Sequence, residues 1–242
     1  APLGLVRDGL YSGQFEGLAA LAKLCSAQEL GSLLHDQGVV AAPANVEWLL
    51  LHGADAEVRD AQGDVPMFAL LARGPDALSV LQVLMRRGLS PAGVGGLARF
   101  MAASVPHQHA VKALETFALR LLERGADAFG ASKAGDAPLS LAVRLGWMDM
   151  LDRLLDLGVD REARDGHGMS ALHLATALGR EAVLKQLILK GASPHARAAD
   201  GQTPLGVALS AGRRDLADWL DWRGWPLPGR PLRAEGLPAA AR

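Results

Sequence analysis

The chain contains very little that could cross-link it or anchor it in a membrane. Its 242 residues include a single cysteine, Cys25, so an internal disulfide and a tetracysteine zinc site are both excluded. One cysteine is compatible with a reducing compartment. No apolar run reaches the roughly 18 residues that a transmembrane helix needs. The first residues also lack a positively charged start followed by an apolar stretch. We therefore expect neither a membrane span nor a signal peptide.

Net charge is also nearly absent. Lysine and arginine total 25 against 26 acidic residues, which gives a formal charge of −1. Without a global basic field, neither nucleic acid nor a membrane surface is expected as a partner. Half of the residues are hydrophobic, which is typical of a folded protein and excludes a disordered chain.

Lysine is scarce as well, at 5 residues against 20 arginines. This bias is typical of a GC-rich genome and favours a bacterial source. For such a protein we expect a location in the cytoplasm, or delivery into a host cell as an effector. The chain begins at Ala1 rather than methionine, as a processed form or a part of a larger protein does.

Glycine is abundant, and it recurs at a fixed spacing. Three sets of glycines repeat every 33 residues, and a short motif between them repeats in the same register. The sets are Gly125, Gly158, Gly191 and Gly224; Gly135, Gly168 and Gly201; and Gly146, Gly179 and Gly212. The motif occurs at Ala137–Ser140, Ser170–His173 and Thr203–Gly206. Such a period predicts one small unit that stacks into a solenoid.

Each unit is predicted to contain two short helices. Pro138 and Pro204 suit the first helical position, and we expect Ser170 and Thr203 to cap helices through their hydroxyls. The glycine set that includes Gly146 ends the first helix, because glycine adopts the left-handed conformation at little cost. The second helix carries apolar residues at i, i+1, i+4 and i+5, so it has two apolar faces. In one unit these are Val183, Leu184, Leu187 and Ile188.

These motifs resemble the ankyrin repeat, whose unit opens with T-P-L-H-x-A and closes with G-A-D. Thr203-Pro204-Leu205 and Leu172-His173 match the opening, and Gly125-Ala126-Asp127 matches the closing. The resemblance is strong from about residue 120 to 226 and weaker from about 30 to 120. It implies an all-α ankyrin-repeat solenoid of about six stacked helix-turn-helix units, with degenerate N-terminal repeats.

The repeat also predicts how the chain is divided. Residues 1–26 are expected to form N-terminal capping helices, around Phe15 to Leu24, and residues 27–226 to form the ankyrin-repeat array. The period breaks at about 90–125, where an irregular unit should have one helix at 94–103 and another from Gln108 to Glu123. Residues 227–242 offer no periodic apolar face and are expected to be a flexible tail.

The last unit shows where the array should stop. Asp221 stands where earlier units have an apolar residue, and burying an unpaired carboxylate against another unit is costly. We therefore expect Asp221 to face solvent. Three tryptophans, Trp219, Trp222 and Trp225, cluster in this unit, and residues 226–228 are expected to fold back over them.

The seven histidines do not form a recognisable metal or acid–base site. The resemblance implies that His173, in the opening motif, braces the turn. His35 and His52 fall at helix ends of a degraded repeat, where we expect surface or cation–dipole roles. His107 and His109 are two residues apart, so they do not share a helix face as the i, i+4 pair of a helical zinc site does. We therefore expect no metal.

Nucleophilic catalysis has no support in the sequence either. Cys25 has no histidine at motif spacing and is interpreted as a small buried residue. No G-x-S-x-G elbow occurs, and Gly95-Gly96 lacks the Lys-Ser or Lys-Thr of a phosphate loop. We therefore expect no enzyme activity and no cofactor.

The resemblance implies that turns and first helices line a concave groove, whose residues are free to serve a partner. The candidates taken from register are Arg73, Lys133, Asp136, Arg144, Leu145, His167, Met169, Leu178 and Gln202. Apolar residues flanked by charges, with Trp147 nearby, are typical of a protein-binding patch. The alternative is that Met169 and Leu178 are partly buried between repeats.

Two functions are consistent with this groove. The favoured one is a non-catalytic protein–protein interaction module, either an adaptor or effector, or part of a larger protein, that binds another protein. The alternative is a small-ligand sensor, in which Arg73, Lys133 and Arg144 converge on a phosphate-bearing molecule such as a nucleotide.

Overall fold

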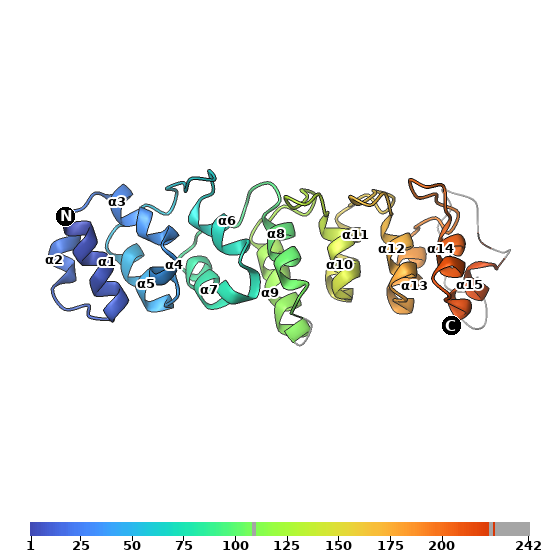
Figure 1. Cartoon of the computed structure of the whole chain (residues 1–242), viewed down its shortest axis with the longest axis horizontal. Helices are drawn as coiled ribbons and strands as arrows, with labels where there is room; N and C mark the ends of the chain where they lie inside the picture. Colours follow the sequence, from blue (N-terminus) through green and yellow to red (C-terminus); the bar gives the residue numbers. More distant parts are fainter. Residues whose placement is uncertain (108–109, 223–224, 226–242) are drawn as a thin grey trace.

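The computed structural model describes residues 1–107, 110–222 and 225. These residues form a row of helix pairs stacked along one axis, with the first and last described helices at opposite ends of the row (Figure 1). Secondary structure in the described residues is helical apart from one isolated bridge between Arg164 and Ser170. The all-α solenoid expected from the sequence is confirmed.

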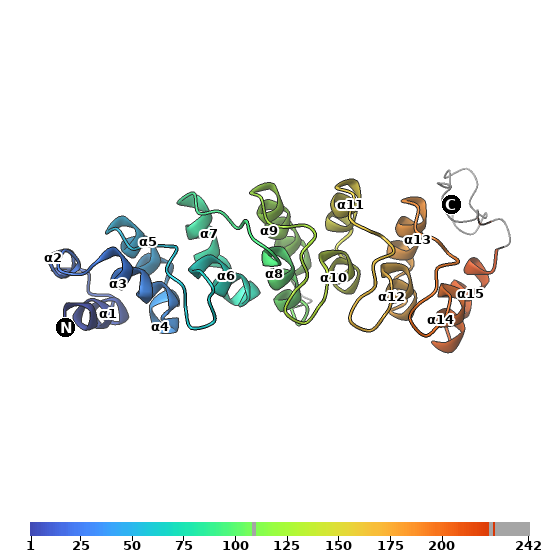
Figure 2. The same cartoon turned by 90° about the horizontal axis from the view of Figure 1, so that it is seen from above.

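The helices lie in two rows, one of first helices and one of second helices (Figure 2). The first helices are α3 (Ala27–Ser32) with η1 (Leu33–His35), α6 (Pro66–Leu71), α8 (Gly96–Ser104), α10 (Pro138–Leu145), α12 (Ala171–Ala177) and α14 (Pro204–Ser210). The second helices are α5 (Pro43–Leu51), α7 (Leu78–Arg86), α9 (Val111–Glu123), α11 (Met148–Asp156), α13 (Glu181–Leu189) and α15 (Arg214–Leu220). Consecutive first helices from α6 to α14 pack against one another.

Four elements lie outside this pattern. They are α1 (Pro2–Ser12), α2 (Leu18–Ala22), α4 (Gln37–Val40) and η2 (Gly74–Ala77). The N-terminal helices thus begin earlier than the stretch from Phe15 to Leu24 indicates, because α1 precedes it. The buried amide of Asn45 on α5 donates to the carbonyls of Leu10 and Val39, at 3.2 and 3.0 Å, and so ties α1 to the stack.

The helix starts confirm one predicted cap and correct another. The Thr203 hydroxyl accepts a hydrogen bond from the Gly206 N–H at 3.2 Å, as predicted. Ser170 makes no such cap. Its Oγ lies 2.7 Å from Nδ1 of His173 instead. The imidazole three residues later competes with the helix N–H groups for the serine hydroxyl, and no such ring follows Thr203.

The glycines that end the first helices also make room for a bond between units. Gly146 has a φ of 69°, a conformation that favours glycine. The Arg180 side chain crosses this glycine and donates to the Arg144 carbonyl at 2.6 Å, so that a Cβ on Gly146 would lie 2.7 Å from the guanidinium. One period later, Arg213 donates to the Ala177 carbonyl at 3.2 Å. The units of α10, α12 and α14 are therefore joined by the same arginine-to-carbonyl bond.

The irregular unit keeps the core continuous but shortens the turn before it. Its helices α8 and α9 begin at residues 96 and 111, two or three residues after the expected starts. Phe100 and Phe117 pack in the core with ring centroids 5.3 Å apart. The connection from α7 to α8 spans only residues 87–95, whereas the next one, from α9 to α10, spans residues 124–137.

The C-terminal end has the features that the last unit predicts. Asp221 is exposed, and Trp225 packs edge-on against both Trp219 and Trp222, with centroids 4.7 and 4.8 Å apart. The expected return of residues 226–228 and the expected flexible tail at 227–242 lie outside the described residues.

Candidate functional site

The turns between units project from one edge of the stack as a row of fingers (Figure 1). Each finger is closed by one backbone bond, in which an N–H donates to the carbonyl four residues further on, at 2.9–3.0 Å. The pairs are Asp60 with Asp64, Ser132 with Asp136, Asp165 with Met169, and Ala198 with Gln202. Because the same bond recurs, the fingers present equivalent positions along the edge.

The first side chain of a finger fixes its tip. Oδ1 of Asp165 accepts from the N–H groups of His167 and Met169 at 2.9 and 3.0 Å. Asp60 does the same in its own finger. Ala198 has no side chain that can accept these bonds, so the finger at 198–202 lacks this support.

Arg144 contributes to the structure of a finger rather than standing free. Its guanidinium lies 3.5 Å from Oδ2 of Asp165, whose side chain is fully buried. A buried carboxylate needs a partner of opposite charge, and Arg144 supplies it. Arg144 therefore has a partner within the fold, and its contribution to binding another protein stays a prediction.

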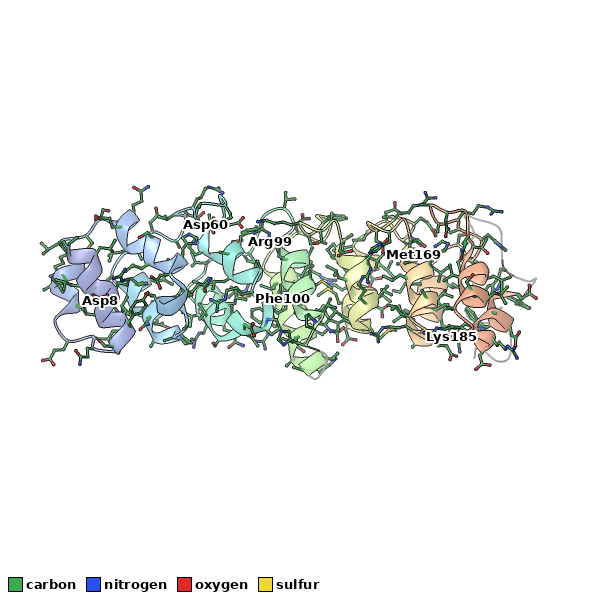
Figure 3. The ribbon with its side chains drawn as sticks, in the orientation of Figure 1. Asp8, Asp60, Arg99, Phe100, Met169 and Lys185 are labelled. Carbon is green, nitrogen blue, oxygen red and sulfur yellow. The ribbon has the colours of Figure 1, made fainter. Side chains whose placement is uncertain are left out.

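A second charge cluster lies where the α7–α8 connection is short. Asp64 lies 2.8 Å from Arg99 on α8 and 3.5 Å from Lys133 on a later finger. Figure 3 shows Arg99 on the finger side of the stack. The hydrogen bond from Arg99 lowers the pKa of the Asp64 carboxyl below its ordinary value, although burial opposes this. Lys133 thus bridges the gap left by the short connection.

These pairings count against the small-ligand alternative. Arg144 faces the buried carboxylate of Asp165, and Lys133 lies 3.5 Å from Asp64, a carboxylate that it shares with Arg99. Arg73 follows α6 and is half-buried. The described residues therefore do not show the three basic groups assembled for an anion.

The remaining candidates divide by burial. His167, Leu178 and Gln202 are exposed, and Leu178 keeps 42% of its surface in contact with solvent. Met169 and Asp136 are half-buried. Leu178 and Met169 therefore differ in exposure. Met169 fits the alternative of partial burial between repeats, and Leu178 does not.

Two candidates of the apolar stripe are corrected by the structure. Leu145 is only 9% exposed and Trp147 only 1%, so both belong to the core. Leu145 is the last residue of α10, and Trp147 is the residue before α11. An apolar residue that the register did not indicate is exposed: Leu209 on α14, at 63%. Thr176, one period earlier, is buried, which indicates that Leu209 is exposed because α14 is the last first helix.

The buried histidine braces the finger as the resemblance implies. His173 is fully buried, and its Nε2 lies 3.1 Å from the Ala196 carbonyl and 2.9 Å from the Gln202 carbonyl. His35 contacts the carbonyl of Val58 at 2.7 Å, and Val58 stands at the same offset from His35 as Ala196 from His173. The expected surface role of His35 is therefore wrong, because its ring supports the next turn.

Cys25 lies in an environment that suppresses thiol chemistry. It is half-buried, and its Sγ lies 3.6 Å from the Leu21 carbonyl. Burial raises the pKa of the thiol, and the Glu29 carboxylate raises it further. A raised pKa leaves little thiolate, which is the reactive form.

We accordingly expect Cys25→Ser to leave partner binding unchanged, because the oxygen keeps the size and the hydrogen-bonding capacity of the thiol. Affinity measured by calorimetry, together with a circular dichroism spectrum of the variant, tests this. Lost binding with an unchanged spectrum would make Cys25 a functional group.

The described residues offer no assembled metal site. Across residues 1–107, 110–222 and 225, no three histidine, cysteine, aspartate or glutamate side chains gather as ligands. The pair of His107 and His109 is not a test of this, since His109 lies outside the described residues. In the same part of the chain, none of the helices combines the length and the low polarity that crossing a bilayer requires.

Comparisons with known proteins agree with the fold. Residues 100–198 match the family model described as ankyrin repeats (3 copies). The structure is similar to the ankyrin repeat domain of Bcl-3, described as a unique member of the IkappaB protein family, with a TM-score of 0.63 and 24% identity. That alignment covers 88% of this chain and 96% of the Bcl-3 domain. A search among curated proteins found no match.

The chain therefore has the ankyrin-repeat solenoid fold, and residues 100–198 are ankyrin repeats. This segment runs from α8 to the finger before α14. The count of about six units stays a prediction.

Proposed function

We propose that the chain is a non-catalytic protein-interaction module that binds another protein through its fingers and first helices. Ankyrin repeats are a protein–protein interaction module, and this supports the class of function. A bacterial origin, and a location in the cytoplasm or in a host cell, belong to the same proposal and are supported by the excess of arginine over lysine.

One observation carries the choice of surface. The fold uses the finger backbones, Asp165 and Arg144 to hold the edge rigid, while His167, Leu178 and Gln202 nearby remain exposed. A rigid edge that presents an exposed leucine beside polar groups loses little conformational entropy on binding. Such residues are typical anchors of an interface.

We expect Leu178→Ala with Gln202→Ala to weaken partner binding at least ~10-fold, because truncating central interface residues commonly costs ~1–3 kcal/mol. The melting temperature should change little, since both side chains are exposed. The partner is captured from native lysate with the wild-type chain, and its affinity for each variant is then measured by calorimetry.

Leu157→Ala is the matched control. Leu157 is 42% exposed, as Leu178 is, but it follows the second helix α11 rather than a first helix. The control should bind like the wild type. If the two variants and the wild type bound the partner with equal affinity, the interface would not lie on the finger edge.

A further inference from the structure

Two cavities are lined by residues of the second helices. Figure 2 shows these helices as a row apart from the first helices. One, of about 510 Å³, lies between α5 and α7, and the other, of about 530 Å³, lies between α7 and α9. Arg86, at the end of α7, lines both. The two cavities therefore form one continuous surface, which the finger edge does not include.

The cavity between α5 and α7 is apolar. Trp48 and Leu51 of α5 line it together with Phe15, which approaches from the α1–α2 connection. The rings of Phe15 and Trp48 lie 6.3 Å apart, and Leu51 is 62% exposed. An exposed cluster of two aromatic rings and a leucine is a feature of binding surfaces.

The cavity between α7 and α9 has an apolar floor and a basic rim. Met85 and Phe117 form the floor and are buried. The rim carries three arginines, Arg86, Arg120 and Arg124, against one carboxylate, Glu123. Among the residues that the structure describes, neither Arg120 nor Arg124 forms an ion pair.

Arg86 itself is only weakly held. It is 73% exposed and lies 3.8 Å from Glu47, whose carboxylate receives a closer hydrogen bond, at 3.0 Å, from Arg87. Glu47 is therefore already satisfied by Arg87, and Arg86 can turn toward an incoming anion.

We propose that this second-helix surface binds a protein segment in which apolar side chains are followed by acidic ones. The apolar side chains enter the cavity of Phe15, Trp48 and Leu51. The carboxylates lie against Arg86, Arg120 and Arg124, where each guanidinium offers paired N–H donors that match a carboxylate. The shared Arg86 fixes the order of the two parts of the segment.

Charge and shape favour this occupant over a nucleic acid. A strand of nucleic acid needs a continuous basic track, whereas here the basic rim borders an apolar cavity. An acidic peptide with apolar anchors uses both cavities at once.

The test uses the full chain and three synthetic fluorescent peptides that share one tryptophan- and leucine-containing core. The core is followed by several glutamates, by several glutamines, or by several lysines. Fluorescence anisotropy should show the glutamate peptide binding at least ~10-fold more tightly than the glutamine peptide, with affinity falling as salt is raised. Equal affinity for the three peptides, or no binding of the glutamate peptide, overturns the proposal.

Variants locate the site. Arg120→Gln with Arg124→Gln should weaken the glutamate peptide at least ~10-fold, and Leu51→Ala should weaken the glutamate and glutamine peptides alike. Arg153→Gln is the matched control, because Arg153 is an exposed arginine on the next second helix, α11. A single-stranded oligonucleotide that binds with the same dependence on Arg120 and Arg124, and displaces the peptide, would make the surface a nucleic-acid site and overturn the proposal.

The proposal for this surface and the proposal for the finger edge can be tested independently of each other. Leu178→Ala should leave the glutamate peptide bound, because Leu178 follows a first helix. Loss of peptide binding in that variant would contradict a site on the second helices, whereas loss of only the lysate partner would bear on the finger edge alone.

Discussion

Replacing Asp165 with alanine is expected to lower the free energy of unfolding by about 3 kcal/mol. The carboxylate is fully buried, accepts from the N–H groups of His167 and Met169, and faces Arg144. Its removal leaves two finger N–H groups and a mostly buried guanidinium without their acceptor. Chemical denaturation followed by circular dichroism measures the loss.

Asp160→Ala is the control for this variant. Asp160 is exposed and accepts one N–H, from Glu162, at 2.9 Å in the turn before the same finger. We expect its replacement to cost less than about 1 kcal/mol, as for other exposed sites. A similarly small loss for Asp165→Ala would mean that the finger does not depend on its buried carboxylate.

The ion pair between Arg144 and Asp165 also limits the use of Arg144 variants in binding experiments. Arg144→Ala leaves the buried Asp165 carboxylate uncompensated, so the variant should be destabilised as well. Weaker partner binding by such a variant would then report a loosened finger as readily as a lost contact. For this reason Leu178 and Gln202 are the better probes of the interface.

Leu172→Ala and Leu187→Ala should each destabilise the chain by about 2–4 kcal/mol, the usual cost of truncating a buried leucine. Leu172 lies on α12 and Leu187 on α13, and neither exposes any surface. Each faces the core between the two helix rows, where the neighbouring units leave little room to collapse. Chemical denaturation measures both, with the exposed Leu157→Ala as the reference.

A loss below about half a kcal/mol for both leucines would show that the inward faces of α12 and α13 are misassigned. Because units of a repeat stack contact only their neighbours, the loss should appear first in the C-terminal units. Fluorescence of the tryptophans at that end, Trp219, Trp222 and Trp225, should then change before the helical signal of the whole chain.

The period in the sequence predicted the helix pairs because glycine and proline act locally. Gly146 ends α10 and Pro204 begins α14 through their own backbone preferences, which no distant residue alters. The irregular unit at about 90–125 stays a prediction, and it was drawn from a break in the period that is itself visible. Its helix starts differ from the prediction by two or three residues, because no cap marks them.

Burial and side-chain partners were less predictable, since they depend on neighbouring units. Leu145 and Leu178 occupy the same register position, yet one is 9% and the other 42% exposed. Their helices have different neighbours: α10 packs against α8 of the irregular unit and against α12, whereas α12 packs against α10 and α14. The pairing of Arg144 with Asp165 likewise joins residues of different units, and a period alone does not reveal which charges meet.

The arginine-to-carbonyl bond between units bears on how long such a chain can be. Its acceptor is a main-chain oxygen, at Arg144 in one unit and Ala177 in the next, so the acceptor position tolerates any side chain. Loss of one whole period would bring the arginine of the following unit to the carbonyl of the preceding one. Gene duplication or unequal recombination by whole periods therefore changes the length of the stack while preserving its bonding, and the area offered to partners can grow or shrink in steps of one unit.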